Sequence, residues 1–109
     1  MKLDFNGIEE VALPEFKGGK KRMLARMYTD ELTKIMRGTL EPGASIGMHT
    51  HETNSEMIYI LSGNGKVLYD NGEESLSAGD CHYCPKGHAH SLMNDGEENL
   101  VFFAVVPEQ

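Results

Sequence analysis

Residues 49–56 read HTHETNSE, with two histidines one residue apart, a polar stretch, and a glutamate five positions after the second histidine. Side chains alternate between the two faces of an extended strand, so His49 and His51 would share one face, about 6.6 Å apart. Glu56 follows His51 at an odd spacing and would point to the other face of an unbroken strand. The polar residues 52–55 are of the kind that turns favour. We therefore predict that His51 ends one strand and that Glu56 begins the next.

The rest of the chain predicts an antiparallel all-β domain. Between turns lie short segments of strand length, and Asn-Gly and Asp-Gly pairs supply the positive φ that tight hairpins need. The turn signals are Glu-Pro-Gly at 41–43, Gly-Asn-Gly at 63–65, Asp-Asn-Gly at 70–72, Ala-Gly-Asp at 78–80, Pro-Lys-Gly at 85–87 and Asn-Asp-Gly at 94–96. Many short strands that close on themselves form a barrel or jelly roll, which can enclose a pocket.

Three segments carry more specific expectations. Residues 100–106, LVFFAVV, are apolar at every position and predict a central strand that is buried on both faces. Residues 44–51 predict one continuous strand that leads into the histidine pair. Residues 22–29 contain good helix formers, but their length and basic lead-in favour a strand added at the edge of a sheet.

Length and charge limit the classes of function. The chain has 109 residues, which suits one domain spanning 1–109. Residues 1–48 carry eight basic against seven acidic side chains, whereas 49–109 carry two against ten. Such an acidic half argues against a nucleic-acid partner, and the basic run at 17–22 is interpreted as a solvated loop. Residues 1–16 form neither a secretory signal nor a membrane span, so no membrane partner is expected and a cytoplasmic location is predicted.

The histidines form a candidate metal site. All five lie between positions 49 and 90, and His90 follows a Pro-Lys-Gly turn on a segment where it shares a face with Leu92 and Asn94. If the barrel brings that face opposite His49 and His51, three imidazoles and the Glu56 carboxylate converge. Such ligands suit Fe, Mn, Co, Ni or Zn rather than Ca or Mg. The alternative is a set of hydrogen-bonded core histidines that hold no metal.

Two segments resemble the motifs of the cupin family. Residues 43–63 are similar to the first motif, G-x5-H-x-H-x3,4-E-x6-G, and residues 79–94 to the second, G-x5-P-x-G-x2-H-x3-N. Every fixed position of both motifs is filled. The positions concerned are Gly43, His49, His51, Glu56 and Gly63 in the first, and Gly79, Pro85, Gly87, His90 and Asn94 in the second.

The resemblance implies a cupin double-stranded β-helix, a jelly-roll barrel, with its core at 34–106 and with 1–33 as an N-terminal arm and edge strands. It implies that His49, His51, Glu56 and His90 bind a divalent transition metal. It implies turns at the four motif glycines. It also implies a homodimer built by exchange of an N-terminal strand.

Other side chains are weaker candidates. His82 and Cys84 share one face, where they would line the pocket or hold the metal ligands in place, although an ordinary hydrogen-bonded histidine is the plainer reading of His82. Arg37 could pair with a carboxylate substrate or be a surface arginine. Tyr59 could line a ligand site or pack across a sheet. Cys81 and Cys84 would lie on opposite faces of a strand, which disfavours a disulfide between them.

Three functions remain open from the sequence. The first is a mononuclear metal cupin that acts on a small organic molecule by dioxygenase, isomerase or lyase chemistry, with the metal as Lewis acid or oxygen activator. The second is a non-catalytic module that binds a small molecule and a metal. The third, a metal-free epimerase, is disfavoured by the complete ligand set.

Overall fold

Short turns divide the chain into ten strands and a single 3-10 turn, with almost no helix. The computed structural model describes all of residues 1–109. The elements are β1 Val11–Pro14, the 3-10 turn η1 Phe16–Gly18, β2 Arg22–Thr29, β3 Thr33–Leu40, β4 His49–Thr50, β5 Glu56–Ser62, β6 Asn64–Tyr69, β7 Gly72–Ser77, β8 Cys81–Cys84, β9 Ala89–Met93 and β10 Leu100–Pro107. The all-β prediction is confirmed.

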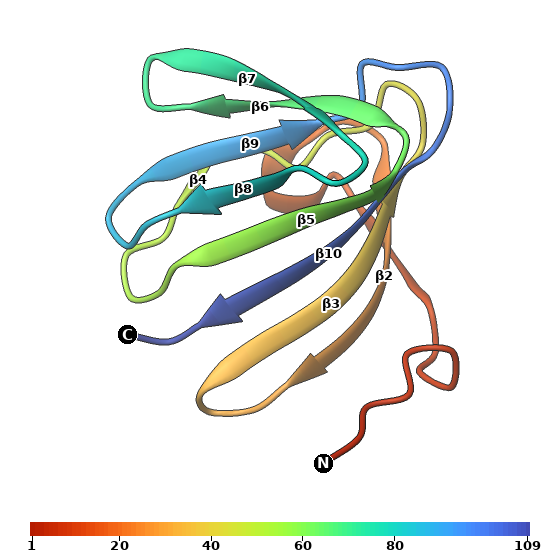
Figure 1. Cartoon of the computed structure of the whole chain (residues 1–109), viewed down its shortest axis with the longest axis vertical. Coiled ribbons are helices and arrows are strands. Elements are labelled where there is room, and N and C mark those ends of the chain that lie inside the picture. Colours follow the sequence, from red (N-terminus) through yellow and green to blue (C-terminus); the bar gives the residue numbers. More distant parts are fainter.

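The strands form two antiparallel sheets that pack against each other as a jelly roll (Figure 1). The larger has six strands in the order β1-β2-β3-β10-β5-β8, and the smaller has four in the order β4-β9-β6-β7. Gly43, Gly63, Gly79 and Gly87, the four glycines that the motifs place in turns, all have positive φ. Left-handed backbone of this kind favours glycine, because other residues pay a steric penalty there.

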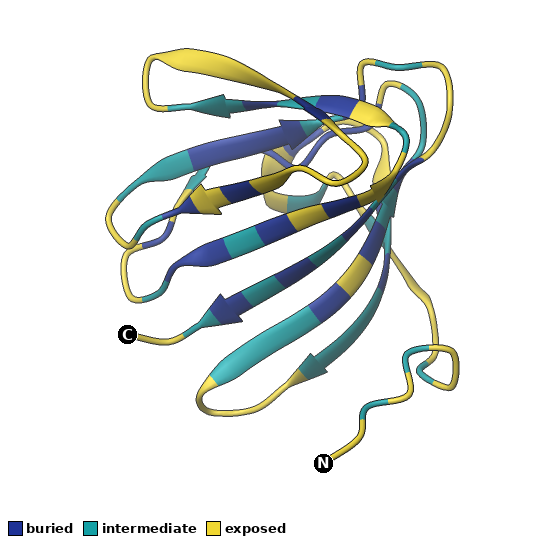
Figure 2. Ribbon diagram, viewed as in Figure 1, coloured by how far each residue is buried: buried dark blue, intermediate teal, exposed yellow.

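The inner faces of the two sheets enclose the hydrophobic core. Burial alternates along β5, β8 and β10 of the larger sheet (Figure 2). The core cluster consists of Met23, Ala25, Met36, Leu40, Ala44, Ile46, Ile58, Ile60, Val67, Leu76, Leu92, Leu100, Phe102 and Ala104. This alternation fixes which side chains of each strand can reach the interior.

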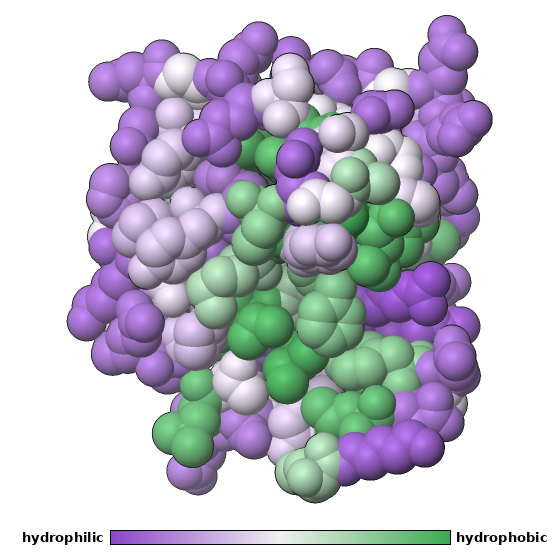
Figure 3. All heavy atoms as spheres, viewed as in Figure 1, coloured by the Kyte–Doolittle hydropathy of each residue, from purple (hydrophilic) through white to green (hydrophobic).

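Strand β10 is central, between β3 and β5, as its composition predicts. Only one of its faces is fully buried, however. Phe102 points into the core, whereas Phe103 is half-buried on the outer face, where the ring of Phe5 packs edge-on at 5.3 Å. The expectation of burial on both faces is therefore wrong for the outer face, because the N-terminal arm covers it only in part. Tyr59, Leu61 and Tyr83 are exposed on the larger sheet, and Figure 3 shows hydrophobic residues gathered on this side.

The segment predicted as one strand at 44–51 is a strand only at His49–Thr50, with an isolated bridge at Ser45. Two backbone amides of this segment bond to the turn around η1 and not to a neighbouring strand. The Ser45 amide donates to Lys20 O and the Gly47 amide donates to Phe16 O, both at 3.0 Å. A Cβ at Gly47 would lie 2.0 Å from the carbonyl oxygen of Lys17. The approach to His49 is thus held by the N-terminal part of the chain.

The N-terminal arm packs along β2 of the same chain. β1 pairs with residues 22–25 of β2 and is itself the edge strand there. The prediction that residues 22–29 form an edge strand therefore holds only for residues 26–29. The guanidinium of Arg26 donates hydrogen bonds to the carbonyl oxygens of Phe5, Asn6 and Ile8 and ties down the preceding loop. No helix in the structure is long and apolar enough to cross a membrane.

Candidate metal centre

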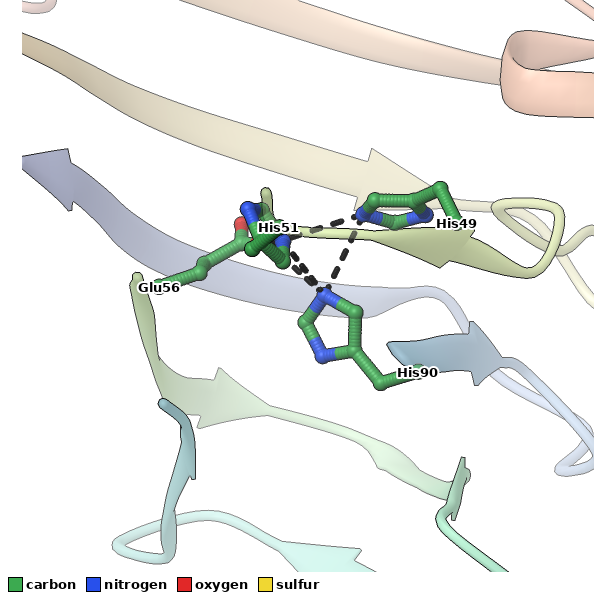
Figure 4. A group of neighbouring side chains, drawn as sticks. All are labelled: His49, His51, Glu56 and His90. Atoms are coloured by element: carbon green, nitrogen blue, oxygen red, sulfur yellow. Dashed lines mark hydrogen bonds and ion pairs between the residues drawn. The ribbon is translucent and has the colours of Figure 1, made fainter. Parts of the chain in front are cut away.

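Four side chains converge between the two sheets (Figure 4). His49 lies on β4 directly opposite His90 on β9, and His51 follows immediately after β4. Glu56 is the first residue of β5, as the turn at 52–55 predicts. One atom from each side chain, the imidazole nitrogens and a carboxylate oxygen, lies within 4.8 Å of all the others.

The atoms that face one another are the three Nε2 atoms and Oε1 of Glu56. His90 Nε2 is 2.9 Å from His51 Nε2 and 3.2 Å from His49 Nε2. The Glu56 oxygen is 2.9 Å from His90 Nε2, 3.1 Å from His51 Nε2 and 3.9 Å from His49 Nε2. This geometry points all four donors at a common position.

The opposite nitrogens of two rings determine where their protons sit. His49 Nδ1 donates to the carbonyl oxygen of Gly47 at 2.7 Å, and a carbonyl can only accept. His51 Nδ1 donates to Asn54 Oδ1 at 2.6 Å. The orientation of that amide is fixed because Asn54 Nδ2 donates to Glu108 Oε1 at 2.9 Å.

With Nδ1 protonated, the Nε2 atoms of neutral His49 and His51 carry lone pairs that point at each other and at a carboxylate. Lone pairs at these separations repel unless a proton or a metal cation lies between them, and a metal cation can accept all of them at once. Three imidazole nitrogens and one carboxylate oxygen are donors that suit divalent transition metals rather than Ca or Mg. The residues present therefore fit a metal ion.

The charges of the cluster are strongly coupled. Burial alone would raise the pKa of Glu56, but hydrogen bonds from His49, His51 and His90 outweigh it and hold that pKa well below its usual range. The hydrogen bond with Glu56 raises the pKa of His51, against burial and the positive charge of Lys17. Burial lowers the pKa of His90, against its bond to Glu56. The carboxylate is thus ionised and surrounded by nitrogen donors.

Two of the weaker candidates lie beside the cluster. His82 and Cys84 are both buried on the inner face of β8, where Cys84 stands opposite Glu56 across β5 and β8. His82 Nε2 is 3.0 Å from His90 Nδ1. The Cys84 thiol donates to the carbonyl oxygen of His88 at 3.6 Å, and both cysteines are free.

The structure places the other two candidates outside. Arg37 on β3 and Tyr59 on β5 are exposed on the outer face of the larger sheet. Their strand neighbours Met36 and Ile58 point inward, and side chains alternate along a strand. Neither Arg37 nor Tyr59 can therefore contact a molecule bound at the cluster.

Two residues that fill no fixed position of either motif also contact the site. Asn54 fixes the ring of His51, and Glu74 Oε1 is 3.0 Å from His82 Nδ1. The position of Asn54 three residues after His51 is a local signal that could have been recognised. Nothing in the sequence pairs Glu74 with His82, since only the packing of β7 against β5 and β8 brings it there.

A cavity of about 330 Å³ opens beside the cluster. His49, His51 and Glu56 form part of its wall, and Lys17 and Lys34 contribute positive charge. The lining also includes four apolar and three further acidic side chains, Phe16, Met36, Ile46 and Val106 with Asp30, Glu52 and Glu108, and the remaining lining residues are threonines and Asn54. A small molecule in this cavity would contact the cluster directly.

Residues 36–106 match the family model described as a cupin domain, Cupin_2. An oxalate-binding protein of Thermotoga maritima is 40% identical over 88 residues, which are 80% of this chain and 63% of the relative. The oxalate decarboxylase OxdC of Bacillus subtilis is 35% identical over 72 residues, 62% of this chain and 19% of the relative. The chain thus spans less than two thirds of the length of either relative.

Among solved structures, a predicted oxalate decarboxylase from Thermotoga maritima superposes with a TM-score of 0.93 at 28% identity, covering 100% of both chains. The cupin domain of Cnp3 from Schizosaccharomyces pombe has a TM-score of 0.81 at 13% identity and covers 100% of this chain and 74% of that one. The second likeness shows the fold alone.

Proposed function

Because this chain belongs to the cupin domain family, in its Cupin_2 branch, we propose that it binds one divalent transition metal through His49, His51, Glu56 and His90 and holds a small organic acid beside it. The observation that supports the proposal is the convergence of three imidazole Nε2 atoms and the Glu56 carboxylate on one position, with the Nδ1 atoms of His49 and His51 hydrogen-bonded to other acceptors. Which of Fe, Mn, Ni, Zn or Co is bound is left to elemental analysis.

The relatives, rather than the net charge of the cavity, suggest an anionic ligand of few atoms. The cavity wall holds more acidic than basic side chains, but its Lys17 and Lys34 can pair with carboxylate oxygens. The relatives that are named for oxalate bind or act on a dicarboxylate of that size. We therefore propose oxalate, or a similarly small carboxylic acid, as the first ligand to test.

Some residues of the site would bind the metal, and others would shield a bound ligand from water. The side chain of His49 is 18% exposed, against 8% for His51, 7% for Glu56 and 1% for His90, so the cluster opens toward the cavity at His49. Met36, Ile46 and Val106 keep part of that wall apolar and limit water around a bound ligand. A bound divalent ion would act there as a Lewis acid or redox centre.

Two outcomes separate catalysis from binding alone. The protein is purified without an affinity tag, its metal content is measured by elemental analysis, and oxalate binding is measured by calorimetry with and without the metal. Release of CO2 or formate and consumption of O2 are then followed with oxalate as substrate. Turnover would place the chain with dioxygenase or lyase chemistry, whereas tight binding without turnover would make it a binding module.

Matched variants test the assignment. We expect His51→Ala to lose both metal and oxalate, and Lys34→Ala to keep the metal but bind oxalate more weakly. A protein that binds oxalate equally well after complete removal of metal would contradict the proposal. So would a wild-type protein that retains no divalent metal under any purification.

We further propose that the protein works as a homodimer in the cytoplasm. The exposed Tyr59 and Tyr83, with half-buried Phe103, give the larger sheet an outer surface that a second copy could cover. The two free thiols accord with a reducing compartment.

A further inference from the structure

We propose that Glu74, His82 and His90 form a hydrogen-bonded chain from the protein surface to the metal centre, in which His82 is a positioning residue that fixes the ring and the proton of His90. The inference rests on the proposed metal site. It assigns a role to two residues that do not touch the metal position themselves.

The chain of contacts is continuous. His82 is buried on β8, with its Nε2 3.0 Å from His90 Nδ1 and its Nδ1 3.0 Å from Glu74 Oε1. The rings of His82 and His90 are tilted by 31° with centroids 5.2 Å apart. Glu74 lies on β7 with its side chain 52% exposed, so the chain ends in solvent.

The chemistry orders every proton along this chain. For His90 to offer a lone pair at Nε2, its proton must be on Nδ1, which then donates to His82 Nε2. His82 must therefore carry its own proton on Nδ1, and that nitrogen donates to the Glu74 carboxylate. A carboxylate at the far end makes His82 a better acceptor and His90 a more electron-rich ligand.

Each histidine of the cluster has one hydrogen-bond partner at its Nδ1 atom. The carbonyl of Gly47 serves His49 and the amide of Asn54 serves His51, so both accept from Nδ1 through oxygen. His90 differs, because its partner is another imidazole that could equally have presented a proton. Glu74 selects the one tautomer of His82 that can accept, which is why the proposal needs both residues.

The same atoms could be read as a second metal site, since donor atoms of His82, Cys84 and His90 also lie within 4.8 Å of one another. Both nitrogens of His82 are already engaged by Glu74 and His90. The Cys84 thiol donates to the carbonyl oxygen of His88. We therefore assign His82 to the support of His90, and the number of ions bound per chain tests the alternative of a second metal site.

The test compares variants of His82 by their affinity for Zn²⁺, measured by competition with a chelator at pH 7.5. His82→Gln keeps an acceptor oxygen near the position of Nε2, whereas His82→Leu removes it. We expect His82→Leu to weaken Zn²⁺ binding about 10- to 100-fold, the range typical for loss of such a partner. His82→Gln should recover most of that loss, and Glu74→Gln should weaken binding less than His82→Leu.

The matched control is His88→Gln, since the partly exposed side chain of His88 pairs with Asp70 and does not touch the cluster. It should bind Zn²⁺ like the wild type. Nitrogen-15 NMR of the Zn²⁺-loaded protein gives a readout that a merely structural role would not move. The Nδ1 proton of His90 should be visible and protected from exchange in wild type and His82→Gln, and lost in His82→Leu.

Three results would overturn the inference. They are a His82→Leu affinity within threefold of wild type, NMR evidence that His90 binds the ion through Nδ1, and a stoichiometry of two ions per chain that falls to one in Cys84→Ser. If His82→Leu does not fold, the comparison of His82→Gln with Glu74→Gln still decides, because unchanged affinity for Glu74→Gln together with weak binding by His82→Gln contradicts the chain. Failure of the wild type to bind Zn²⁺ would instead reject the metal site itself.

Discussion

His49 and His90 lie directly opposite each other across β4 and β9, with their Nε2 atoms 3.2 Å apart. Because β4 contains only His49 and Thr50, this pair is half of the ladder that joins β4 to the smaller sheet. An ion bound by the pair would therefore also hold the edge of that sheet in place.

The first prediction is that the metal stabilises the fold. An ion that binds only the folded chain adds about 2.7 kcal/mol to the free energy of unfolding at one hundred times its dissociation constant. We expect the melting temperature at pH 7.5 to rise on metal loading and to fall with a chelator. His51→Ala should abolish the difference, while His88→Ala should keep it. An equal melting temperature with and without metal would reject the ligand set.

The second prediction concerns acid and the metal-free protein. The folded pKa of Glu56 is held well below its unfolded value, so its stabilising contribution is present above the unfolded pKa and is lost as pH falls through the folded value. Urea unfolding between pH 5 and 3 should show a steep loss of stability. Glu56→Gln should flatten that slope; a slope as steep as that of the wild type would contradict the assignment.

The third prediction concerns acid and the loaded protein. Metal binding requires neutral imidazoles, whereas the unfolded chain takes up protons below about pH 6.5. The stabilisation by metal is thus present above that pH and lost as pH falls. In the metal-free protein His51 has the opposite trend, because its raised pKa stabilises the fold below the unfolded pKa and that contribution is lost as pH rises through the folded value. The gap in melting temperature between the two forms should narrow from pH 7 to 5.

The fourth prediction tests the packing beneath the site. A Cβ at Gly38 of β3 would lie 2.4 Å from Cζ of Phe102, in the centre of the core. Overpacking of this kind costs about 1–3 kcal/mol, so Gly38→Ala should lower the free energy of unfolding by that amount. Gly72→Ala is the control, since its Cβ would meet open space and its effect should stay within about 0.5 kcal/mol. Equal effects in urea unfolding would refute this view of the core.

The fifth prediction separates the two thiols. Cys81 is exposed, whereas Cys84 is buried with its pKa raised to about 11 by burial and by the Glu56 and Asp70 charges. Iodoacetamide at pH 8 should modify Cys81 and leave Cys84 intact, as mass spectrometry of peptides would show. A reducing agent should leave the melting temperature unchanged. Rapid modification of Cys84 in the folded protein would contradict its placement.

The predicted homodimer can be tested by light scattering at micromolar concentration, where the mass should be twice that of one chain. If the outer surface of the larger sheet forms the interface, Tyr59→Lys should give monomers. Leu32→Lys is the control, since Leu32 is 74% exposed and lies between β2 and β3, away from Tyr59. A wild-type protein with the mass of one chain would contradict the proposed homodimer.

Local spacing was sufficient to predict much of this molecule. The odd step from His51 to Glu56 required a turn, and alternation placed His90, Leu92 and Asn94 on one buried face. The same alternation places Arg37 on the outer face of β3 with Ile35. Its proposed pairing with a carboxylate substrate rested on the chemistry of the guanidinium group and not on its position in the strand. The alternation of side chains along a strand depends only on neighbouring residues, so it can be predicted from the sequence.

Contacts between different elements were not predictable in this way. The loop at 16–20 accepts the backbone hydrogen bonds of Ser45 and Gly47, and Glu74 of β7 contacts His82 of β8, because of how these elements fold onto one another. Neither contact leaves a periodic or compositional signal in the sequence. The prediction of one continuous strand at 44–51 was wrong for this reason.

The solvent end of the hydrogen-bonded chain has a consequence for how such a protein could diversify. None of the residues that line the cavity belongs to β7, where Glu74 lies. A substitution at Glu74 would therefore alter how strongly the ion is held without changing the shape presented to an incoming acid. Selection could adjust metal preference and ligand preference through separate, single mutations, and a descendant could change its chemistry while its pocket stays intact.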